Sequence, residues 1–264
     1  MYSRARAALL ATVLAAAVAA CGIANPLAPD YEYEEDLTLS LDGSASLVVN
    51  ASVPALDALK SMSLDADVAA GADPIRDELR ARYTSPYTSV GRISTWTRHG
   101  RRFVGIHLTI PDVRVLPKAA LFAGRSYELR PEGALLTFRQ TLAQPTAPTV
   151  TLPPWRGDEV VAFRLHLPAR IRYQNSRYLD RNESRPSARG NIVVWEQRLS
   201  ERLKGKPIAY AEDRTADVME VRMDRESILY RTLWLFGIAF AAALLVLAGL
   251  IWLTMRRGAD TESA

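Results

Sequence analysis

The stretch Thr232–Met255 near the C-terminus carries no charged side chain. A helix of this length reaches about 36 Å, which is enough to cross a hydrocarbon core of about 30 Å. Trp234 and Trp252 lie near its two ends, where indole rings favour the membrane interfaces. A buried core helix would need a partner that covers apolar surface on every side, and the polar remainder of the chain offers none. The stretch therefore predicts a transmembrane helix over residues 231–255, with a short tail over 256–264.

The N-terminus has the layout of an export signal over residues 1–20. Arg4 and Arg6 form a basic start, an apolar run too short to span a membrane follows, and small residues precede Cys21. The Val-Ala-Ala-Cys sequence that ends at Cys21 resembles the lipobox of bacterial lipoproteins, in which the cysteine is diacylated and becomes the new N-terminus. That resemblance implies lipid attachment, such as palmitate, at Cys21. The alternative is ordinary cleavage at a nearby Ala-x-Ala site, which leaves Cys21 incidental.

The export signal and the apolar helix together predict the topology. A lipidated N-terminus and linker over 21–33 precede an extracytoplasmic domain over 34–230, and the tail after the helix lies in the cytoplasm. Cys21 is the single cysteine, so no intrachain disulfide forms. An exported domain of about 200 residues buries enough core to do without one. Two anchors then hold the domain stably at the cell membrane.

Alternation of apolar and polar residues dominates the exported region. Leu37–Leu41 and Ala45–Val53 alternate on both sides of Asp42-Gly43, a pair that suits the tight turn of a β-hairpin. The remaining elements expected from their patterns are hairpins over 90–110 and 127–142, strands at 160–167, 192–195 and 218–223, helices near 54–62, 73–83, 117–122 and 196–204, a Pro-rich connection at 144–158 and an Arg-rich loop at 175–191. This pattern favours one α+β domain on an antiparallel, hairpin-rich sheet, because βαβ alternation is absent.

Charge is distributed unevenly along the chain. Residues 22–90 contain 12 acidic and 4 basic residues, whereas residues 91–231 contain 25 basic and 15 acidic ones. Each Lys or Arg near an anionic membrane surface contributes about 1 kcal/mol to binding. The candidate headgroup-binding residues come from the densest basic run and are Arg170, Arg172, Arg177 and Arg181. A solvated Arg-rich loop is the alternative. Nucleic acid is not an expected partner, because the topology places the domain on the other side of the membrane.

The sequence contains no recognisable catalytic or metal-binding motif. His99, His107 and His166 are the only histidines, and none has a second histidine or a cysteine at metal-ligand spacing. Phosphate-binding glycine loops, dinucleotide fingerprints and nucleophile motifs are absent as well. The acidic run of Glu32, Glu34, Glu35 and Asp36 is expected to be solvated within the linker, and cation binding is the alternative. The chain is therefore predicted to be non-enzymatic, with no cofactor and no metal.

The whole layout resembles the LppM-type bacterial lipoproteins. The matching features are the lipobox at Cys21, the first hairpin with Leu-Thr-Leu-Ser-Leu-Asp-Gly-Ser-Ala, the stretch Arg102–Asp112, and the C-terminal helix followed by arginines. The resemblance implies a curved sheet around an apolar cavity and binding of an envelope lipid or glycolipid, with no catalytic residues. Two main functions stay open. One is a membrane-anchored envelope lipoprotein that binds lipid, glycolipid or anionic headgroups; the alternative is an interaction module that recruits a membrane-protein partner.

Overall fold

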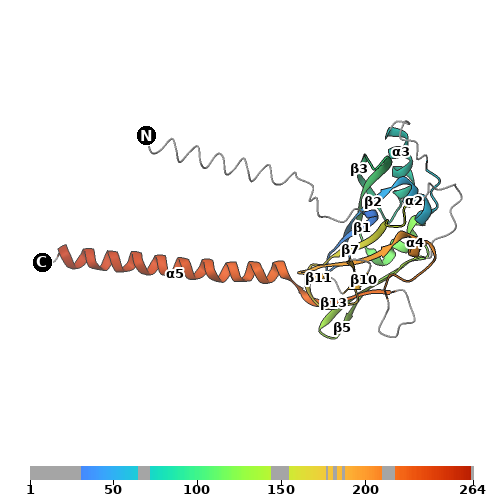
Figure 1. The fold of residues 1–264 in the computed structure, drawn as a ribbon. Helices are drawn as coiled ribbons and strands as arrows, with labels where there is room; N and C mark the ends of the chain where they lie inside the picture. Colours follow the sequence, from blue (N-terminus) through green and yellow to red (C-terminus); the bar gives the residue numbers. More distant parts are fainter. Residues whose placement is uncertain are drawn as a thin grey trace. The chain divides into compact units, whose positions relative to one another are not determined.

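The computed structural model describes residues 31–64, 72–143, 155–176, 178–180, 183–185, 188–209 and 218–262, all within the unit Tyr31–Ala264. Cys21 and the predicted signal peptide therefore lie outside the described residues, as does most of the Pro-rich connection. The elements, labelled in Figure 1 where there is room, are β1 (Tyr31–Leu39), β2 (Ala45–Ser52), α2 (Val53–Lys60), α3 (Ala72–Tyr83), β3 (Ser89–Arg98), β4 (Arg101–Ile110), η1 (Val113–Lys118), η2 (Ala120–Phe122), β5 (Ser126–Glu132), β6 (Leu135–Thr141), β7 (Val160–His166), β8 (Ala169–Gln174), β9 (Tyr178–Asp180), β10 (Glu183–Arg185), β11 (Ala188–Arg189), β12 (Ile192–Arg198), α4 (Leu199–Leu203), β13 (Val218–Ser227) and α5 (Ile228–Glu262).

Two main sheets organise the domain. The larger sheet has seven strands in the order β11-β12-β7-β1-β2-β4-β3, and the smaller one has four in the order β5-β6-β13-β8. A separate two-stranded ribbon pairs β9 with β10. The α+β class is confirmed, but the expectation of a single antiparallel sheet is wrong in two respects, since there are two main sheets and the larger one is mixed.

The mixed character of the larger sheet comes from its central strand. β1 pairs antiparallel with β2 but parallel with β7, so that Leu37 lies opposite both Leu47 and Leu165. Hairpin patterns report only strands that are neighbours along the chain, so they carry no information on this long-range pairing. The parallel pair places the acidic segment of β1 beside the basic residues of β7.

The predicted hairpins are confirmed, and their turns have the geometry that their residues favour. Gly43 adopts φ +97°, and the carboxylate of Asp42 accepts a hydrogen bond from the backbone N–H of Ser44 at 2.9 Å. At the tip of the β3–β4 hairpin, His99 and Gly100 have φ of +49° and +72°. Two consecutive positive φ angles give a turn whose twist matches that of the flanking strands.

Short helices form where local caps support them. Ser52 accepts a hydrogen bond from the N–H of Ala55 at 3.2 Å, and Pro54 occupies the first turn of α2. Ser61 ends this helix in the left-handed conformation. The predicted helices near 54–62 and 73–83 are thus confirmed as α2 and α3.

The predictions for the last third of the domain need correction. The expected loop at 175–191 contains the short strands β9, β10 and β11. The helix expected from Glu196 begins only at Leu199, because β12 continues to Arg198 in register with β7. Glu196 and Gln197 face buried surroundings within the strand, which a surface helix would not require.

The two main sheets share one hydrophobic core. Its buried cluster includes Leu37 and Val49 from the larger sheet, Phe138 and Val221 from the smaller sheet, and Leu56 from α2. Along β1 the buried face carries Tyr33, Glu35, Leu37 and Leu39 at alternate positions. Glu35 is the one charged residue in this row, which places a carboxylate inside the core.

Gly105 of β4 marks a close approach on the opposite face of the larger sheet. A Cβ atom at this position would lie 2.7 Å from Ser94 Oγ and 3.2 Å from the indole of Trp96. We expect Gly105→Ala to lower the free energy of unfolding by about 1–3 kcal/mol, because these side chains must move. Thermal melting of the full-length chain checks this. Gly91→Ala is the matched control, since its nearest contact would be an ordinary 3.5 Å; equal losses in the two variants would contradict the steric explanation.

Candidate functional site

A cluster of three buried ionic side chains joins the two sheets, and we call it the Glu35 cluster. Glu35 lies in β1, Lys60 is the last residue of α2, and Arg125 precedes β5. Glu35 Oε1 lies 3.3 Å from Lys60 Nζ, and Glu35 Oε2 lies 2.6 Å from Arg125 Nη1. The side chains of Glu35, Lys60 and Arg125 are 4%, 4% and 8% exposed. One buried carboxylate thus forms ion pairs with two buried cations.

Aromatic side chains complete the surroundings of the Glu35 cluster. The hydroxyl of Tyr33 donates a hydrogen bond to Glu35 Oε1. Tyr127 accepts hydrogen bonds from Arg125 Nη1 and from Gln140 Nε2, each at 3.3 Å. Lys60 Nζ donates to the carbonyl of Leu121 at 3.1 Å and lies 4.7 Å from the ring centroid of Phe122. The charges are therefore held by hydrogen bonds and by an aromatic face, in surroundings that exclude bulk water.

The electrostatics of the Glu35 cluster follow from burial and from mutual attraction. Burial alone would raise the pKa of Glu35, but Arg125, Lys60 and the hydrogen bonds more than offset it and lower that pKa to about 2. Burial, reinforced by the repulsion from Arg125, lowers the pKa of Lys60 to about 7 despite the attraction of Glu35. Burial raises the pKa of Tyr127 to about 12. Near neutral pH, Lys60 is thus the group of this cluster that exchanges a proton most readily.

Tyr83 of α3 lies close enough to the cluster to interact electrostatically with Glu35. Its pKa is raised by burial and, next, by the Glu35 carboxylate. Tyr83 is 2% exposed, and within the described part of the chain its hydroxyl has no hydrogen-bond partner. A buried hydroxyl without a partner costs about 1–3 kcal/mol, so this interior is not optimised for stability alone.

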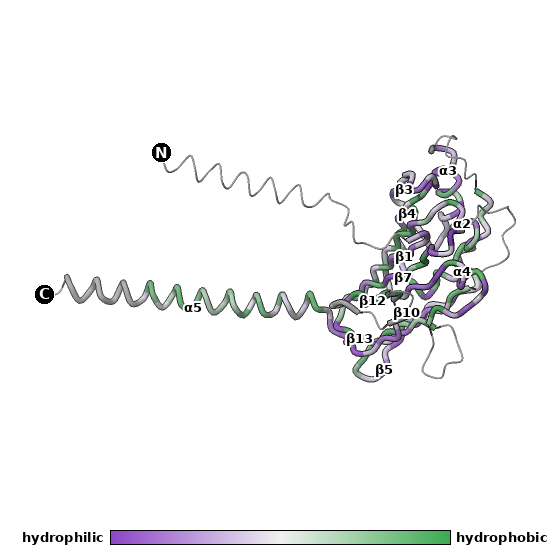
Figure 2. Tube along the Cα trace, viewed as in Figure 1, coloured by the Kyte–Doolittle hydropathy of each residue, from purple (hydrophilic) through white to green (hydrophobic). Residues whose placement is uncertain are grey.

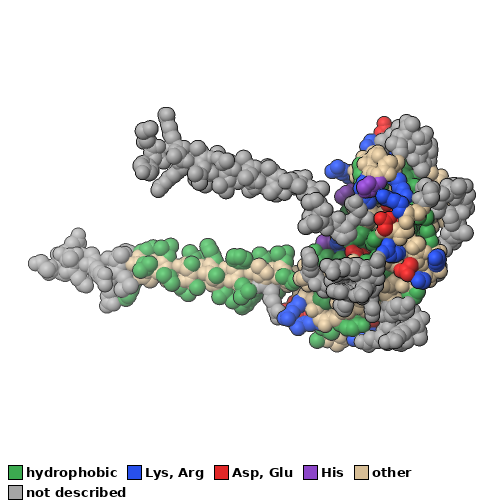
Figure 3. All heavy atoms as spheres, in the orientation of Figure 1, with side chains coloured by type: hydrophobic (Ala, Val, Ile, Leu, Met, Phe, Trp, Pro, Cys, Tyr) green, Lys and Arg blue, Asp and Glu red, His purple; other side chains and the backbone are tan. Residues whose placement is uncertain are grey.

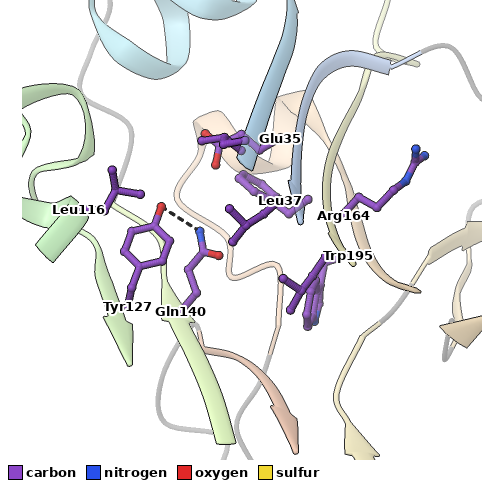
Figure 4. Close-up of a pocket in the computed structure, with 10 residues that line it drawn as sticks. Glu35, Leu37, Leu116, Tyr127, Gln140, Arg164 and Trp195 are labelled. Carbon is purple, nitrogen blue, oxygen red and sulfur yellow. Dashed lines mark hydrogen bonds between the residues drawn. The ribbon is translucent and has the colours of Figure 1, made fainter. Parts of the chain in front are cut away.

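A small cavity lies on one side of the Glu35 cluster, between the two sheets. It has a volume of about 10 Å³, which is room for about one water molecule. In Figure 4, Tyr127 and Gln140 are joined by their hydrogen bond, and the guanidinium of Arg164 points away from the other labelled side chains. The residues that line this first cavity are Glu35, Leu37, Leu47, Leu116, Tyr127, Gln140, Phe163, Arg164, Leu165 and Trp195. A cavity of this size does not hold an acyl chain.

A second cavity also adjoins the cluster, through Arg125 and Tyr33. It also has a volume of about 10 Å³, and it is lined by Tyr33, Leu59, Arg125, Leu142, Ala143, Phe163 and Arg202. With room for about one water molecule each, neither of these two cavities matches the apolar, lipid-binding cavity implied by the family resemblance. Both are polar at one end because they meet the Glu35 cluster.

The acidic run Glu32–Asp36 is part of the central strand β1, so the expectation that it is solvated within a linker is wrong. Glu32 lies 3.0 Å from Arg101, and Glu34 lies 3.0 Å from Arg164. Asp36 lies 3.5 Å from Arg164 and 3.1 Å from His166 Nε2. The acidic first part of the chain and the basic second part therefore meet as ion pairs, across the neighbouring strands β1 and β7 and between β1 and the start of β4.

The structure describes two of the four predicted headgroup-binding arginines. Arg170 and Arg172 are exposed on β8, whereas Arg177 and Arg181 lie outside the described residues. Arg172 forms a two-point ion pair with Asp224 of β13, with distances of 2.7 and 2.9 Å. Arg170 has no ion pair within the described residues. Of the two described arginines, Arg170 is therefore the one with an uncompensated charge.

The end of the smaller sheet adjoins the start of α5. Ser227, the last residue of β13, pairs with Ala169, the first residue of β8. The N–H of Ile228 donates to the carbonyl of Pro168 at 3.0 Å, so the first residue of α5 is tied to β8. Arg170 and the exposed Arg225 of β13 lie within two residues of this junction, or about 7 Å of strand. Sequence patterns singled out Arg170 but not Arg225, whose position just before the apolar stretch was the available signal.

The segment Ile228–Trp252 of α5 is long and apolar enough to cross a membrane. Its mean hydropathy is 2.5, and none of it is buried against the rest of the protein. Figure 2 shows hydrophobic residues recurring along this helix, and in Figure 3 hydrophobic side chains project along its described part, with backbone and other atoms visible between them. A core helix of a soluble protein with the same composition would be mostly covered. α5 begins at Ile228, three residues before the predicted start of the apolar helix at residue 231.

Within the described ranges, no group of three or more His, Cys, Asp or Glu side chains is placed to hold a metal ion. His107 and His166 lie on the polar face of the larger sheet, as their alternation with apolar residues indicates. The absence of a cofactor and of enzymatic activity stays a prediction. Lipid attachment at Cys21 also stays a prediction, because Cys21 lies outside the described residues.

Comparisons with known proteins give one structural likeness to report. No protein-family model matches the chain, and no curated protein matches its sequence. Among solved structures, the folded domain of LppM from Mycobacterium tuberculosis, determined by NMR, is similar to it. The match covers 77% of this chain and 95% of that domain, with 17% sequence identity and a TM-score of 0.36. The likeness to LppM predicted from the sequence is thus found, at a level of similarity from which no ligand follows.

Proposed function

We propose that this chain is a non-enzymatic, membrane-anchored envelope protein whose domain holds anionic lipid headgroups at the base of α5. The observation that carries the proposal is the junction of β13, β8 and α5. Because no linker separates Ser227 from the apolar helix, the end of the smaller sheet lies at the membrane interface when α5 spans the bilayer. Arg170 and Arg225 are exposed there and make no ion pair within the described residues.

Surface binding of headgroups is favoured over storage of a whole lipid in the interior. The two cavities beside the Glu35 cluster each have a volume of only about 10 Å³. An arginine near an anionic surface contributes about 1 kcal/mol without any cavity. Phosphate oxygens also match the donors of a guanidinium group that no carboxylate occupies. Arg172 is a weaker candidate, since Asp224 already takes two of its donors.

Replacing Arg170 and Arg225 together by glutamine is expected to reduce the preference for anionic lipid. The full-length chain is placed in nanodiscs that contain equal amounts of phosphatidylcholine and phosphatidylglycerol. Native mass spectrometry then counts the lipids that remain bound after release. We expect the phosphatidylglycerol preference to fall about five-fold for each arginine removed, which corresponds to about 1 kcal/mol.

The matched control removes the same charge elsewhere, through Arg82→Gln in α3 and Arg92→Gln in β3. An equal loss in this control would mean that only net charge matters, and it would contradict a headgroup site at the junction. An unchanged preference in Arg170→Gln, Arg225→Gln would contradict it as well. A recurring protein crosslinked to the domain, with no lipid preference, would favour the interaction module instead.

A further inference from the structure

β3 forms one edge of the seven-stranded sheet, and only its first half is protected (Figure 1). Its register with β4 shifts between Val90 and Ile93, and Arg80 Nη1 of α3 donates to the carbonyls of Val90 and Gly91 at 3.3 and 3.2 Å. A bulge and a covering side chain are devices that keep an edge strand from pairing with another chain. Within the described part of the protein, the segment Ile93–Thr97 has neither device, and we call it the edge segment.

The edge segment has the composition of a strand that pairs readily. It contains no charged residue, no proline and no glycine, and β-branched or aromatic residues fill four of its five positions. The other edges of the two main sheets differ, since β11 has two residues, β5 contains Pro131, and β8 carries the exposed Arg170 and Arg172. Outside α5, Trp96 is the one exposed large hydrophobic side chain among the described residues, at 38%. That apolar exposure therefore coincides with the unprotected edge.

The backbone groups of the edge segment that lack a neighbouring strand can be assigned from the turn. Arg98 pairs with Arg101 across the two-residue turn of the β3–β4 hairpin. Counting back from this pair, the N–H and C=O groups of Thr97, Thr95 and Ile93 point away from β4. No described strand lies beyond β3 on this side. A row of donors and acceptors at every second residue is thus available to another strand.

We propose that the edge segment pairs with the edge segment of a second copy of this chain, antiparallel and about a two-fold axis at Thr95. Ile93 then lies opposite the partner's Thr97, and Ser94 lies opposite the partner's Trp96. Each indole therefore faces a small side chain across the axis. The indole is already held in place in the single chain, because it stacks on Phe103 with ring centroids 5.7 Å apart.

The charges beside this axis are compatible with self-association. Arg76 Nη2 donates to the hydroxyl of Thr95 at 3.2 Å, and Arg76 Nη1 forms an ion pair with Asp73 at 3.0 Å. Each copy therefore brings one cation and one anion to the axis, with no net charge. Arg98, which lies opposite the partner's Arg92, is drawn back over the sheet, with its guanidinium 4.2 Å from the centroid of an aromatic ring of β4.

Confinement to a membrane favours a second copy over other strand partners. Pairing of the edge segments alone buries less than the roughly 1,000 Å² that a stable complex in solution requires. α5 follows β13 without a linker, so copies whose α5 spans one bilayer present the same edge at the same height. A two-fold axis normal to the membrane relates groups at equal heights, and restriction to one surface raises their effective concentration.

Cysteine crosslinking of the full-length chain in phosphatidylcholine liposomes tests the proposal independently of anionic headgroups. Thr95→Cys lies at the axis, whereas Ser89→Cys lies at the far end of β3. In the proposed pair the two Cα atoms at position 95 are about 5.5 Å apart, and those at position 89 are about 40 Å apart. With a short bismaleimide we expect at least about ten times as much covalent dimer from Thr95→Cys as from Ser89→Cys. The unmodified chain, which retains Cys21, gives the background. Equal yields from the two variants, or no dimer from Thr95→Cys, would overturn the proposal.

Thr97→Pro, added to Thr95→Cys, blocks the edge segment without touching the ladder between β3 and β4. The N–H that proline removes points away from β4, and proline is tolerated at such a position of an edge strand. We expect the yield of dimer to fall about ten-fold, because one hydrogen bond is lost from each copy. Thr97→Ala keeps the N–H and is the matched control, and thermal melting verifies that both chains fold.

Two further outcomes would count against pairing through the edge segment. An undiminished yield in a folded Thr97→Pro chain would assign the association to α5 or to another surface. In cell membranes, crosslinking of Thr95→Cys to a different protein in place of a second copy would overturn the choice of partner.

Discussion

Replacing Glu35 by glutamine is expected to lower the free energy of unfolding by about 3–5 kcal/mol. Glutamine keeps the volume of the side chain, so the loss does not arise from a cavity. It arises because Lys60 and Arg125 stay buried while their shared carboxylate is gone. Urea denaturation of the full-length chain in detergent, followed by near-ultraviolet circular dichroism, measures the change.

The control for Glu35→Gln is Glu128→Gln in β5. Glu128 lies 3.2 Å from Arg130, but both side chains are largely accessible to water, at 35% and 65% exposure. A pair of this kind contributes at most about 1 kcal/mol. Adding Lys60→Met to Glu35→Gln is expected to restore part of the lost stability, because one of the two orphaned cations is removed. A loss below about 1 kcal/mol in Glu35→Gln would show that the carboxylate is not needed to balance them.

The free energy of unfolding is expected to rise with pH between about 7 and 10 because of Lys60. The folded pKa of Lys60 is about 7, whereas a lysine in an unfolded chain has a pKa near 10.4. Over this interval the unfolded state binds more protons than the folded state, so alkalinity favours folding. At about 1.4 kcal/mol for each pKa unit, the upper limit of the gain is about 5 kcal/mol. Denaturation midpoints at pH 7, 8 and 9 check the slope.

Lys60→Met is the variant that isolates this pH effect. It leaves Glu35 and Arg125 as a neutral buried pair, so the fold is retained and the rise with pH should disappear. Measurements stay below pH 10, because the folded pKa values of Tyr33 and Tyr127 are raised and reverse the slope at higher pH. An unchanged slope in Lys60→Met would assign the effect to another group.

Local chemistry made the hairpins predictable. Asp42-Gly43 and His99-Gly100 supply the residues that accept left-handed backbone angles, and the alternating rows on each side then determine which face is buried. The apolar helix was equally predictable from the sequence. Its length and lack of charge indicate a membrane span whichever residues it contacts. Each of these signals is contained within a stretch of about 25 residues or fewer. A single sequence therefore reveals it without any long-range contact.

The Glu35 cluster was only half visible in the sequence. Glu35 alternates with Leu37 and Leu39, so its burial was readable from the same row that predicted the hairpin. Its partners were not, because Lys60 and Arg125 come from other elements and reach it only after the two sheets pack. The parallel pairing of β1 with β7 was hidden for the same reason.

The basic candidates show the limits of charge counting. Arg170 and Arg172 look equivalent in the sequence, two residues apart on one strand. Asp224 distinguishes them, since it pairs with Arg172 from the neighbouring strand and leaves Arg170 to the solvent. Arg225 becomes a candidate because it is exposed on β13 three residues before Ile228, next to the place where Ser227 pairs with Ala169 of β8. Local charge density therefore does not distinguish an arginine that is paired with a carboxylate from one that has no ion pair among the described residues.

The direct passage from β13 into α5 also has a mechanical consequence. A tension or torque along the helix acts directly on β13, because β13 ends at Ser227 and α5 begins at Ile228 with no linker between them. β13 is an inner strand, bonded to β6 on one flank and to β8 on the other. Shear along its axis is then shared by two ladders of hydrogen bonds that must yield together. When α5 spans a bilayer, motions of that bilayer are transmitted to the four-stranded sheet rather than dissipated in a flexible tether.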